Sequence, residues 1–130
     1  MKTLVPLFLL AALVVSVTVQ LPAQAARVTG QVVCLYCVST MGMKRPYHAK
    51  CGQICAMGHV PVGILEKRTA KVYLILPSEH PIVGEMPADV AALARKMGKQ
   101  VTVQGKVVRR LGISAIVLSR RAAIRAPQSH

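Results

Sequence analysis

The chain has 130 residues, with 17 lysines and arginines against four acidic residues, and a net charge of +13. The four carboxylates show no paired spacing of the kind that acid–base hydrolysis needs. The positive charge favours an anionic partner, either an acidic protein or an anionic membrane surface, although a solvated basic surface without a partner is the simpler alternative. Nucleic acid is not expected, because stacking of single-stranded bases needs aromatic side chains and the chain has three tyrosines, one phenylalanine and no tryptophan.

Residues 1–25 have the organisation of a secretory signal peptide. Lys2 gives a basic start, residues 4–19 are apolar apart from Ser16 and Thr18, and the segment ends in the small-x-small pattern that signal peptidase reads. We expect cleavage after Ala25 and a periplasmic or secreted mature protein large enough for one domain. An uncleaved membrane anchor is the alternative, since the apolar run nearly reaches the ~20 residues that span a bilayer.

Hydrophobic periodicity and turn signals predict the order strand, helix, strand, strand, helix, strand, strand. The strands are expected at residues 31–35, 60–65, 71–76, 100–108 and 113–118. The helices are expected at residues 47–57 and 88–97, each followed by a glycine that ends it. Residues 38–46 are rich in Ser, Thr, Met, Gly, Lys and Pro, so we expect a loop there.

Five strands with a helix between the third and the fourth are the sequence order of an OB-like barrel. The fold is therefore expected to be mainly β, with the cysteine-bearing helix inserted after the first strand and residues 60–65 paired antiparallel with residues 71–76. A ferredoxin-like or other α+β sandwich stays open, because element order does not fix strand pairing. We expect one OB-like domain at residues 26–118 and a basic, flexible tail at residues 119–130.

All four cysteines and one histidine lie within a short stretch of the chain. Helical residues three or four positions apart share a face, so His48, Cys51 and Cys55 are expected to project together, with Cys37 approaching from the strand before them. Three thiolates and an imidazole predict a tetrahedral metal site of Cys37, His48, Cys51 and Cys55. An extended segment would point Cys34 and Cys37 to opposite faces, so we expect one of these two cysteines to lie apart from the main ligands.

Soft sulfur ligands favour copper(I), with zinc as the second choice. Met41 and Met43 lie beside the cysteines in the sequence and are expected to be auxiliary donors, although packing under an irregular loop explains the methionines as well. A flexible, accessible ligand set suits sequestration or delivery of the metal by ligand exchange. No catalytic residue is expected, and the chain is more typical of a binding protein than of an enzyme.

Two other uses of the cysteines stay open. Outside the cytoplasm four cysteines commonly form two disulfides, which would make the chain a disulfide-stapled binding module. Cys51 and Cys55, one helical turn apart, are poorly directed for a bridge with each other. The spacing of Cys34 and Cys37 also occurs in dithiol redox proteins, where the pair begins a helix, whereas here it is expected to end a strand. Covalent c-type haem is excluded, because Val38 stands where that attachment needs histidine.

Several segments carry a resemblance to known proteins: Gly30-Gln-Val-Val, His48-Ala-Lys-Cys51, Pro61-Val-Gly-Ile-Leu65, Lys71-Val-Tyr-Leu-Ile75 and Val101-Thr-Val-Gln-Gly-Lys-Val107. Together they resemble a family of small, exported, largely uncharacterised bacterial proteins with an OB-like core. The resemblance implies that the four predicted ligands are the motif positions, whereas Cys34 stands where another residue is usual and is expected to be an auxiliary donor. A second histidine often occurs where this chain has Met41, which bears on the metal preference. The resemblance implies no activity.

Overall fold

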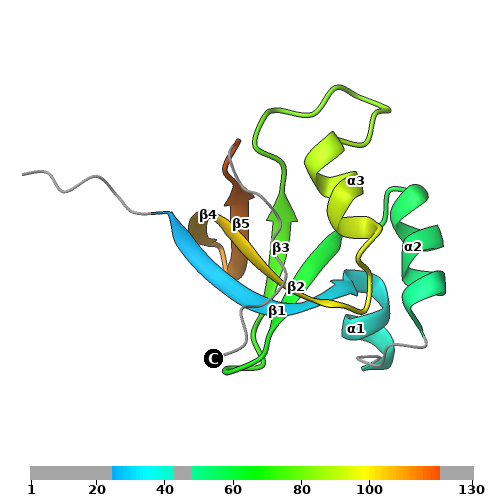
Figure 1. Ribbon diagram of the computed structural model, residues 1–130, viewed down its shortest axis with the longest axis horizontal. Coiled ribbons are helices and arrows are strands. Elements are labelled where there is room, and N and C mark those ends of the chain that lie inside the picture. The colour runs from blue at the N-terminus through cyan, green and yellow to red at the C-terminus, as the bar shows by residue number, and fades with distance from the viewer. Residues whose placement is uncertain (1–24, 43–47, 121–130) are drawn as a thin grey trace, which may run out of the picture.

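The computed structural model of the chain describes residues 25–42 and 48–120 (Figure 1). Five strands form a closed barrel in the order β1-β2-β3-β5-β4, accompanied by three helices, which is the mainly β, OB-like fold that the sequence predicts. The elements are β1 (Ala26–Cys34), α1 (Leu35–Met41), α2 (Ala49–Met57), β2 (Val62–Glu66), β3 (Val72–Leu76), α3 (Ala88–Ala94), β4 (Gln100–Arg110) and β5 (Ile113–Leu118). Residues 1–24 of the predicted signal peptide, Met43 and residues 121–130 of the predicted tail lie outside the described residues.

Strand pairing decides between the barrel and the sandwich. The expected antiparallel pairing of the second and third strands is confirmed, with Gly63 opposite Leu74. Strand β1 pairs antiparallel with both β2 and β4, and β4 pairs antiparallel with β5. Strands β3 and β5 run parallel, with Leu74 opposite Ala115, and this contact closes the sheet into a barrel. The sandwich alternative is therefore wrong.

Glycines at two points allow the strands to coil tightly enough for closure. A side chain at Gly30 of β1 would collide with the backbone carbonyl of Leu65, and one at Gly105 of β4 would collide with the carbonyl of Val117. Both positions therefore bring neighbouring strands closer than a Cβ atom permits, which is the positional role of glycine at bends of small barrels. The alternation around Gly105 is what predicted its strand.

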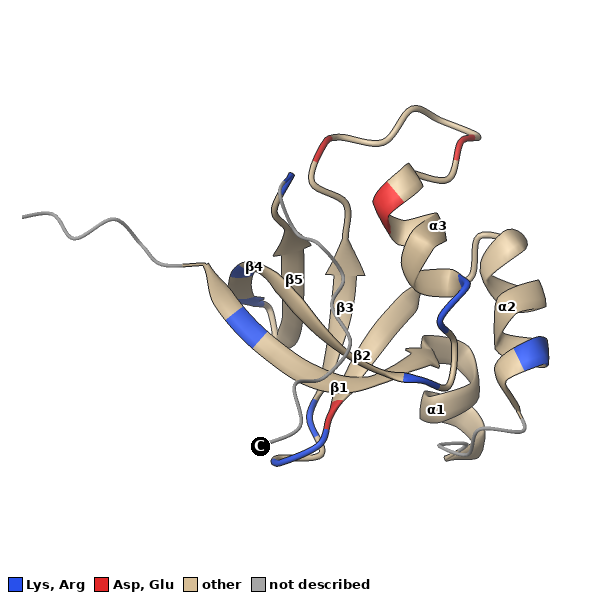
Figure 2. Cartoon of the chain, in the orientation of Figure 1, with Lys and Arg blue, Asp and Glu red and all other residues tan. Residues whose placement is uncertain are grey.

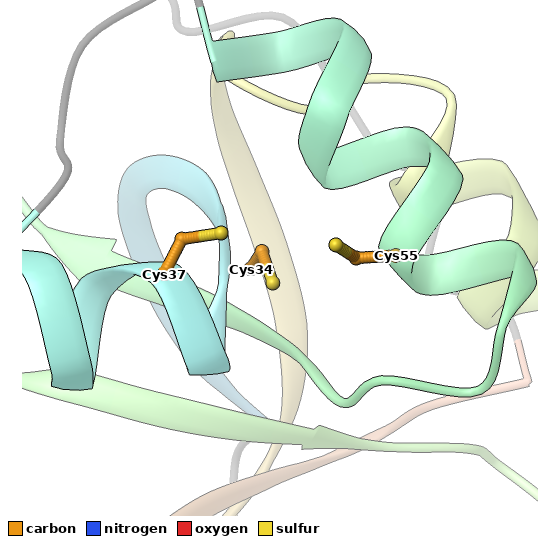
Figure 3. A group of neighbouring side chains, drawn as sticks. All are labelled: Cys34, Cys37 and Cys55. Atoms are coloured by element: carbon orange, nitrogen blue, oxygen red, sulfur yellow. The ribbon is translucent and has the colours of Figure 1, made fainter.

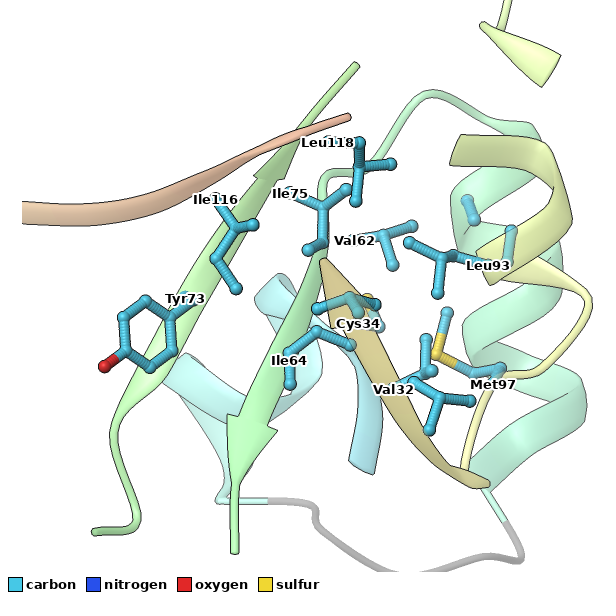
Figure 4. Close-up of a cluster of buried hydrophobic side chains, with 14 of the residues drawn as sticks. Val32, Cys34, Val62, Ile64, Tyr73, Ile75, Leu93, Met97, Ile116 and Leu118 are labelled. Carbon is cyan, nitrogen blue, oxygen red and sulfur yellow. The ribbon is translucent and has the colours of Figure 1, made fainter. Parts of the chain in front are cut away.

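Inward-facing side chains fill the barrel and continue into the helices at one end (Figure 4). The largest fully buried side chains are Val32, Ile64, Leu93, Val103 and Ile116. Leu93 comes from α3, so this helix plugs the end of the barrel rather than lying on its surface. Cys34 belongs to the same buried cluster, which places the first cysteine at the boundary between barrel and helices.

The three helices gather at one end of the barrel (Figure 1). Helix α2 packs against β1 and α3, while α1 packs against β1 and α3 against β2. The turn after α3 is tied to β1 by two backbone hydrogen bonds, from Gly98 N–H to the Val32 carbonyl at 2.8 Å and from Val32 N–H to the Lys99 carbonyl at 3.0 Å. Within the described part of the chain, no helix has the length and apolar character needed to cross a bilayer.

The segment predicted as a loop at residues 38–46 begins instead as a helix. Cys34 keeps an extended backbone and caps α1, while Leu35 N–H leaves the sheet and donates to the Pro61 carbonyl at 3.0 Å. Gly42 ends the helix in the left-handed conformation at φ 60°, and its N–H donates to the Cys37 carbonyl. Seven residues that include β-branched Val38 carry no clear helical periodicity, which is why the pattern predicted a loop.

Other boundaries shift by a few residues. Strand β1 starts at Ala26 rather than at residue 31, and β2 starts at Val62, after the proline. Helix α3 stops at Ala94, so Met97 lies in the turn that follows it. Pairing with β5 carries β4 as far as Arg110, leaving a two-residue turn where four were expected.

Candidate metal centre

Three thiols from three elements meet at the helical end of the barrel. The sulfur atoms of Cys34, Cys37 and Cys55 lie within 4.8 Å of one another, between β1, α1 and α2 (Figure 3). Cys34 and Cys37 are 5% and 4% exposed, whereas Cys55 is half-buried. Around an ion with metal–sulfur bonds of ~2.3 Å, ligand sulfurs are separated by roughly 4 Å, so small side-chain adjustments bring this three-sulfur group onto one ion. The group can hold a metal ion.

The change from strand to helix explains why Cys34 and Cys37 converge. Side chains three residues apart on a strand point to opposite faces, and that reasoning predicted that Cys34 and Cys37 diverge. This prediction is wrong because the strand ends at Cys34 and the helix begins at Leu35. The turn of α1 carries Cys37 back over the end of β1, so both thiols face the same space (Figure 3).

The backbone at each cysteine is held by a hydrogen bond or a strand pair. Cys34 lies opposite Val62 in the β1–β2 ladder, and the Cys37 carbonyl accepts the bond that closes α1. The Cys55 carbonyl accepts from Val60 N–H at 3.0 Å, at the end of α2. His59 adopts φ 62° in this turn and donates its N–H to the Ala56 carbonyl, which completes a Schellman-type cap. The three-sulfur group is therefore preorganised by its backbone.

Crowding of the thiols disfavours their ionisation in the absence of a cation. Burial raises the pKa of Cys37 to about 12, and the neighbouring Cys34 thiol adds to the rise. Burial also raises the pKa of Cys55, with further contributions from Cys34 and Cys51. Several thiolates cannot share this space without positive charge. A bound metal ion supplies that charge, and binding then releases protons.

The structure brings together two of the four predicted ligands, Cys37 and Cys55, and adds Cys34 to them. Cys51 is exposed on α2, one turn before Cys55, outside the three-sulfur group but near enough to influence the pKa of Cys55. His48 is the N-cap of α2 and lines a cavity of about 20 Å³ together with Cys34 and Cys37. That volume suits one water molecule or one ion. The predicted set of Cys37, His48, Cys51 and Cys55 stays a prediction as a ligand set.

A methionine borders this cavity, although not one of those expected. Met41 ends α1 with 51% of its surface exposed, whereas Met97 is buried and lines the cavity. Gly52 of α2 makes room for it, because a Cβ atom there would come within 2.6 Å of the Met97 Cγ. The helical periodicity of residues 88–97 marked Met97 as a core residue. Nothing in the sequence indicated that its thioether lies beside the cysteines.

The cysteine pair begins a helix, as pairs of this spacing do in dithiol redox proteins. Redox pairs depend on one thiol of lowered pKa, whereas burial raises the pKa of both Cys37 and Cys55. The dithiol alternative therefore depends on the spacing and the helix start alone.

The chain matches no protein-family model, no curated protein and no solved structure.

Proposed function

We propose that the chain is an exported protein that binds one thiophilic metal ion through Cys34, Cys37 and Cys55, and that it stores or delivers this ion by ligand exchange. The observation that carries the proposal is the convergence of three thiols within 4.8 Å from three separate elements. Copper(I) is the first choice of metal and zinc is the second. No catalytic base is needed for either role.

The chemistry of the three-sulfur group supports copper(I). Thiolates are soft ligands, and copper(I) is a soft cation that accepts three of them. Among the described residues, no carboxylate joins the group to favour a harder ion. Burial of Cys34 and Cys37 among apolar side chains keeps water and oxidants away from a bound ion.

Zinc needs a fourth ligand, because its protein sites are almost always tetrahedral. His48 is the best placed histidine of the described residues to supply it, since it lines the same small cavity as Cys34 and Cys37. A Cys3His set would then consist of His48 and the three-sulfur group. It differs from the set expected from the sequence because Cys34 takes the place of Cys51.

The accessible side of the site supports exchange with a partner. Cys55 is half-buried and Cys51, one turn away on the same helix, is exposed, whereas Cys34 and Cys37 are buried. An incoming ligand can approach this side, and Cys51 offers a first point of contact for a metal arriving from a donor thiol.

Export is supported by the sequence of residues 1–25 and by where the fold begins. Strand β1 starts at Ala26, directly after the predicted cleavage position, and all five strands lie within residues 26–118. Removal of residues 1–25 therefore leaves in place the five strands and the core of the described residues. The kinship with small exported OB-like proteins stays a prediction of the sequence.

The test is a metal titration of the reduced chain from residue 26 to residue 130 without oxygen, with circular dichroism as a check of folding. Copper(I) is supplied against a coloured chelator of known affinity, and zinc is titrated in the same way. We expect one copper(I) ion per chain and a higher affinity of the chain for copper(I) than for zinc. A variant with alanine at Cys34, Cys37 and Cys55 should bind no stoichiometric metal. Undiminished binding by this variant would refute the proposal.

The disulfide-stapled module is the second candidate, because two of the clustered sulfurs could be joined by oxidation with little movement. The mass of protein isolated without reductant distinguishes the disulfide-stapled module from the metal-binding protein. Two bridges lower the mass by about 4 Da through loss of four thiol hydrogens. We expect four alkylatable thiols after denaturation and bound metal in the native sample. A fully oxidised protein that binds neither copper(I) nor zinc would contradict the metal-binding proposal.

A further inference from the structure

Two hairpin turns lie together at the end of the barrel that faces away from the cysteines. Strands β3 and β5 run parallel, so their first residues, Val72 and Ile113, lie toward the same end. The β2–β3 turn and the β4–β5 turn are therefore neighbours there. Cys34 lies opposite Val62, at the start of β2, whereas the β2–β3 turn follows the other end of that strand. We call this part of the molecule, residues 66–71 and 109–113, the hairpin end.

Lysines and arginines occur in both hairpins of the hairpin end (Figure 2). They are Lys67, Arg68, Lys71, Arg109 and Arg110, all exposed. Glu66, its one acidic residue, accepts a hydrogen bond from the Thr69 hydroxyl. The other acids of the described residues lie beyond the opposite end of β3, with Glu79 and Glu85 in the connection to α3 and Asp89 in the first turn of α3. The hairpin end therefore presents a positive surface with little internal neutralisation.

A leucine at the tip of the β4–β5 turn has no role in the fold. Leu111 adopts φ 51° and Gly112 φ 77°, the two positive values of a type I′ turn, in which asparagine and glycine are preferred. The Leu111 side chain is 100% exposed, and Ile113 beside it is 57% exposed. Leucine here strains the backbone and buries no surface within the chain. Its apolar side chain is available to something outside the molecule.

We propose that the hairpin end docks on the surface of an anionic lipid bilayer, with Leu111 inserted at the boundary between headgroups and acyl chains. Arginines and lysines around an exposed apolar residue match the two layers of such a surface, negative headgroups over hydrocarbon. An acidic protein would satisfy the charges but offers no reason for a fully exposed leucine at the tip of the turn. This orientation leaves the three-sulfur group on the side away from the bilayer.

The first test measures binding of the chain from residue 26 to residue 130 to sedimented vesicles. We expect binding to vesicles that contain phosphatidylglycerol, weakened by salt, and little binding to pure phosphatidylcholine. The double variant Arg109→Gln/Arg110→Gln should lower the partition coefficient roughly 30-fold. Arg95→Gln/Lys99→Gln removes the same charge at the helical end and should lower it by no more than about threefold. Equal losses in the two variants would overturn a localised docking surface.

The second test separates lipid insertion from simple attraction between charges. Leu111→Asn suits the turn and keeps the fold, and it should lower the partition coefficient roughly tenfold. Val83→Asn is the matched control, because Val83 is 99% exposed in the segment after β3, and it should change nothing. Unchanged vesicle binding by Leu111→Asn would overturn the proposal and identify a surface for polyanions or acidic proteins.

Fluorescence gives a direct reading of insertion, since the chain has no tryptophan. Leu111→Trp should shift its emission to shorter wavelength on anionic vesicles and be quenched by brominated acyl chains, whereas Val83→Trp should show neither effect. Identical responses of the two variants would refute insertion of the β4–β5 tip.

Discussion

The thiols of Cys34 and Cys37 face the same point because the chain changes from strand to helix directly after Cys34. A strand continued through both residues would direct the two sulfurs to opposite faces. Helix α2 then supplies Cys55 from the other side, held by the cap that forms at its end. The cysteines therefore differ in exposure and in their expected part in metal binding, and these differences can be measured.

Alkylation should rank the four cysteines by accessibility. Without metal, Cys51 should react first with iodoacetamide, because it is exposed, and Cys37 last, because it is buried and its pKa is raised to about 12. Copper(I) should protect the three-sulfur group and leave Cys51 reactive. Peptide mass spectrometry of briefly labelled protein gives the order. Protection of Cys51 together with free reaction of Cys34 would favour the ligand set expected from the sequence.

Removal of the imidazole should separate the two metals. His48→Ala is expected to weaken zinc binding by tenfold or more, since zinc needs a fourth ligand, and to change copper(I) binding by less than about threefold. Competition titrations measure both affinities. His80→Ala is the control, because His80 is exposed in the segment after β3. Equal losses for both metals in His48→Ala would show that the copper(I) site also uses the histidine.

The raised pKa of Cys37 makes the metal-free fold sensitive to alkaline pH. Below about pH 9 the thiol is protonated in both the folded and the unfolded chain and adds no pH dependence. Above this pH the unfolded chain loses the proton, whereas the folded chain retains it up to about pH 12, so the free energy of unfolding falls as pH rises. Urea unfolding with a chelator present at about pH 8 and about pH 10.5 measures the loss. Cys37→Ala should show a shallower decline, and an equal slope would contradict the raised pKa.

Strain at the tip of the β4–β5 turn should be visible as a stability difference. Leu111→Asn is expected to raise the free energy of unfolding by about 1 kcal/mol, because asparagine tolerates the left-handed conformation better than leucine. Ile113→Asn, which changes a half-exposed residue with an ordinary backbone, should instead leave stability unchanged or lower it. Denaturant midpoints in the absence of lipid provide the comparison. Destabilisation by Leu111→Asn would mean that the leucine packs against the fold.

The sequence predicts the barrel well because apolar and polar residues alternate along its strands and turn residues separate them. Val101, Val103 and Val107 mark β4, and the short polar connection at residues 66–69 correctly predicts the pairing of β2 with β3. Strand ends are less predictable, since pairing continues wherever a partner is present. Arg110 shows this, because it stays in β4 opposite Ile113 despite its place next to a turn.

The candidate site was predictable in composition but not in detail. Cysteine spacing located the site and placed Cys37 and Cys55 in it. Whether Cys34 or Cys51 completes the group depends on a seven-residue helix, α1, which is too short to reveal itself by periodicity. Met97 reaches the cavity only through tertiary packing against Gly52, which no local pattern encodes.

Copper(I) stoichiometry of two single variants, Cys34→Ser and Cys51→Ser, tests the central claim most directly. Both substitutions remove one sulfur from the same short region, but only Cys34 belongs to the three-sulfur group. Cys51→Ser should retain one tightly bound copper(I) ion per chain, while Cys34→Ser should lose it to a competing chelator. Full retention by Cys34→Ser together with loss by Cys51→Ser would contradict the metal centre described by the structure.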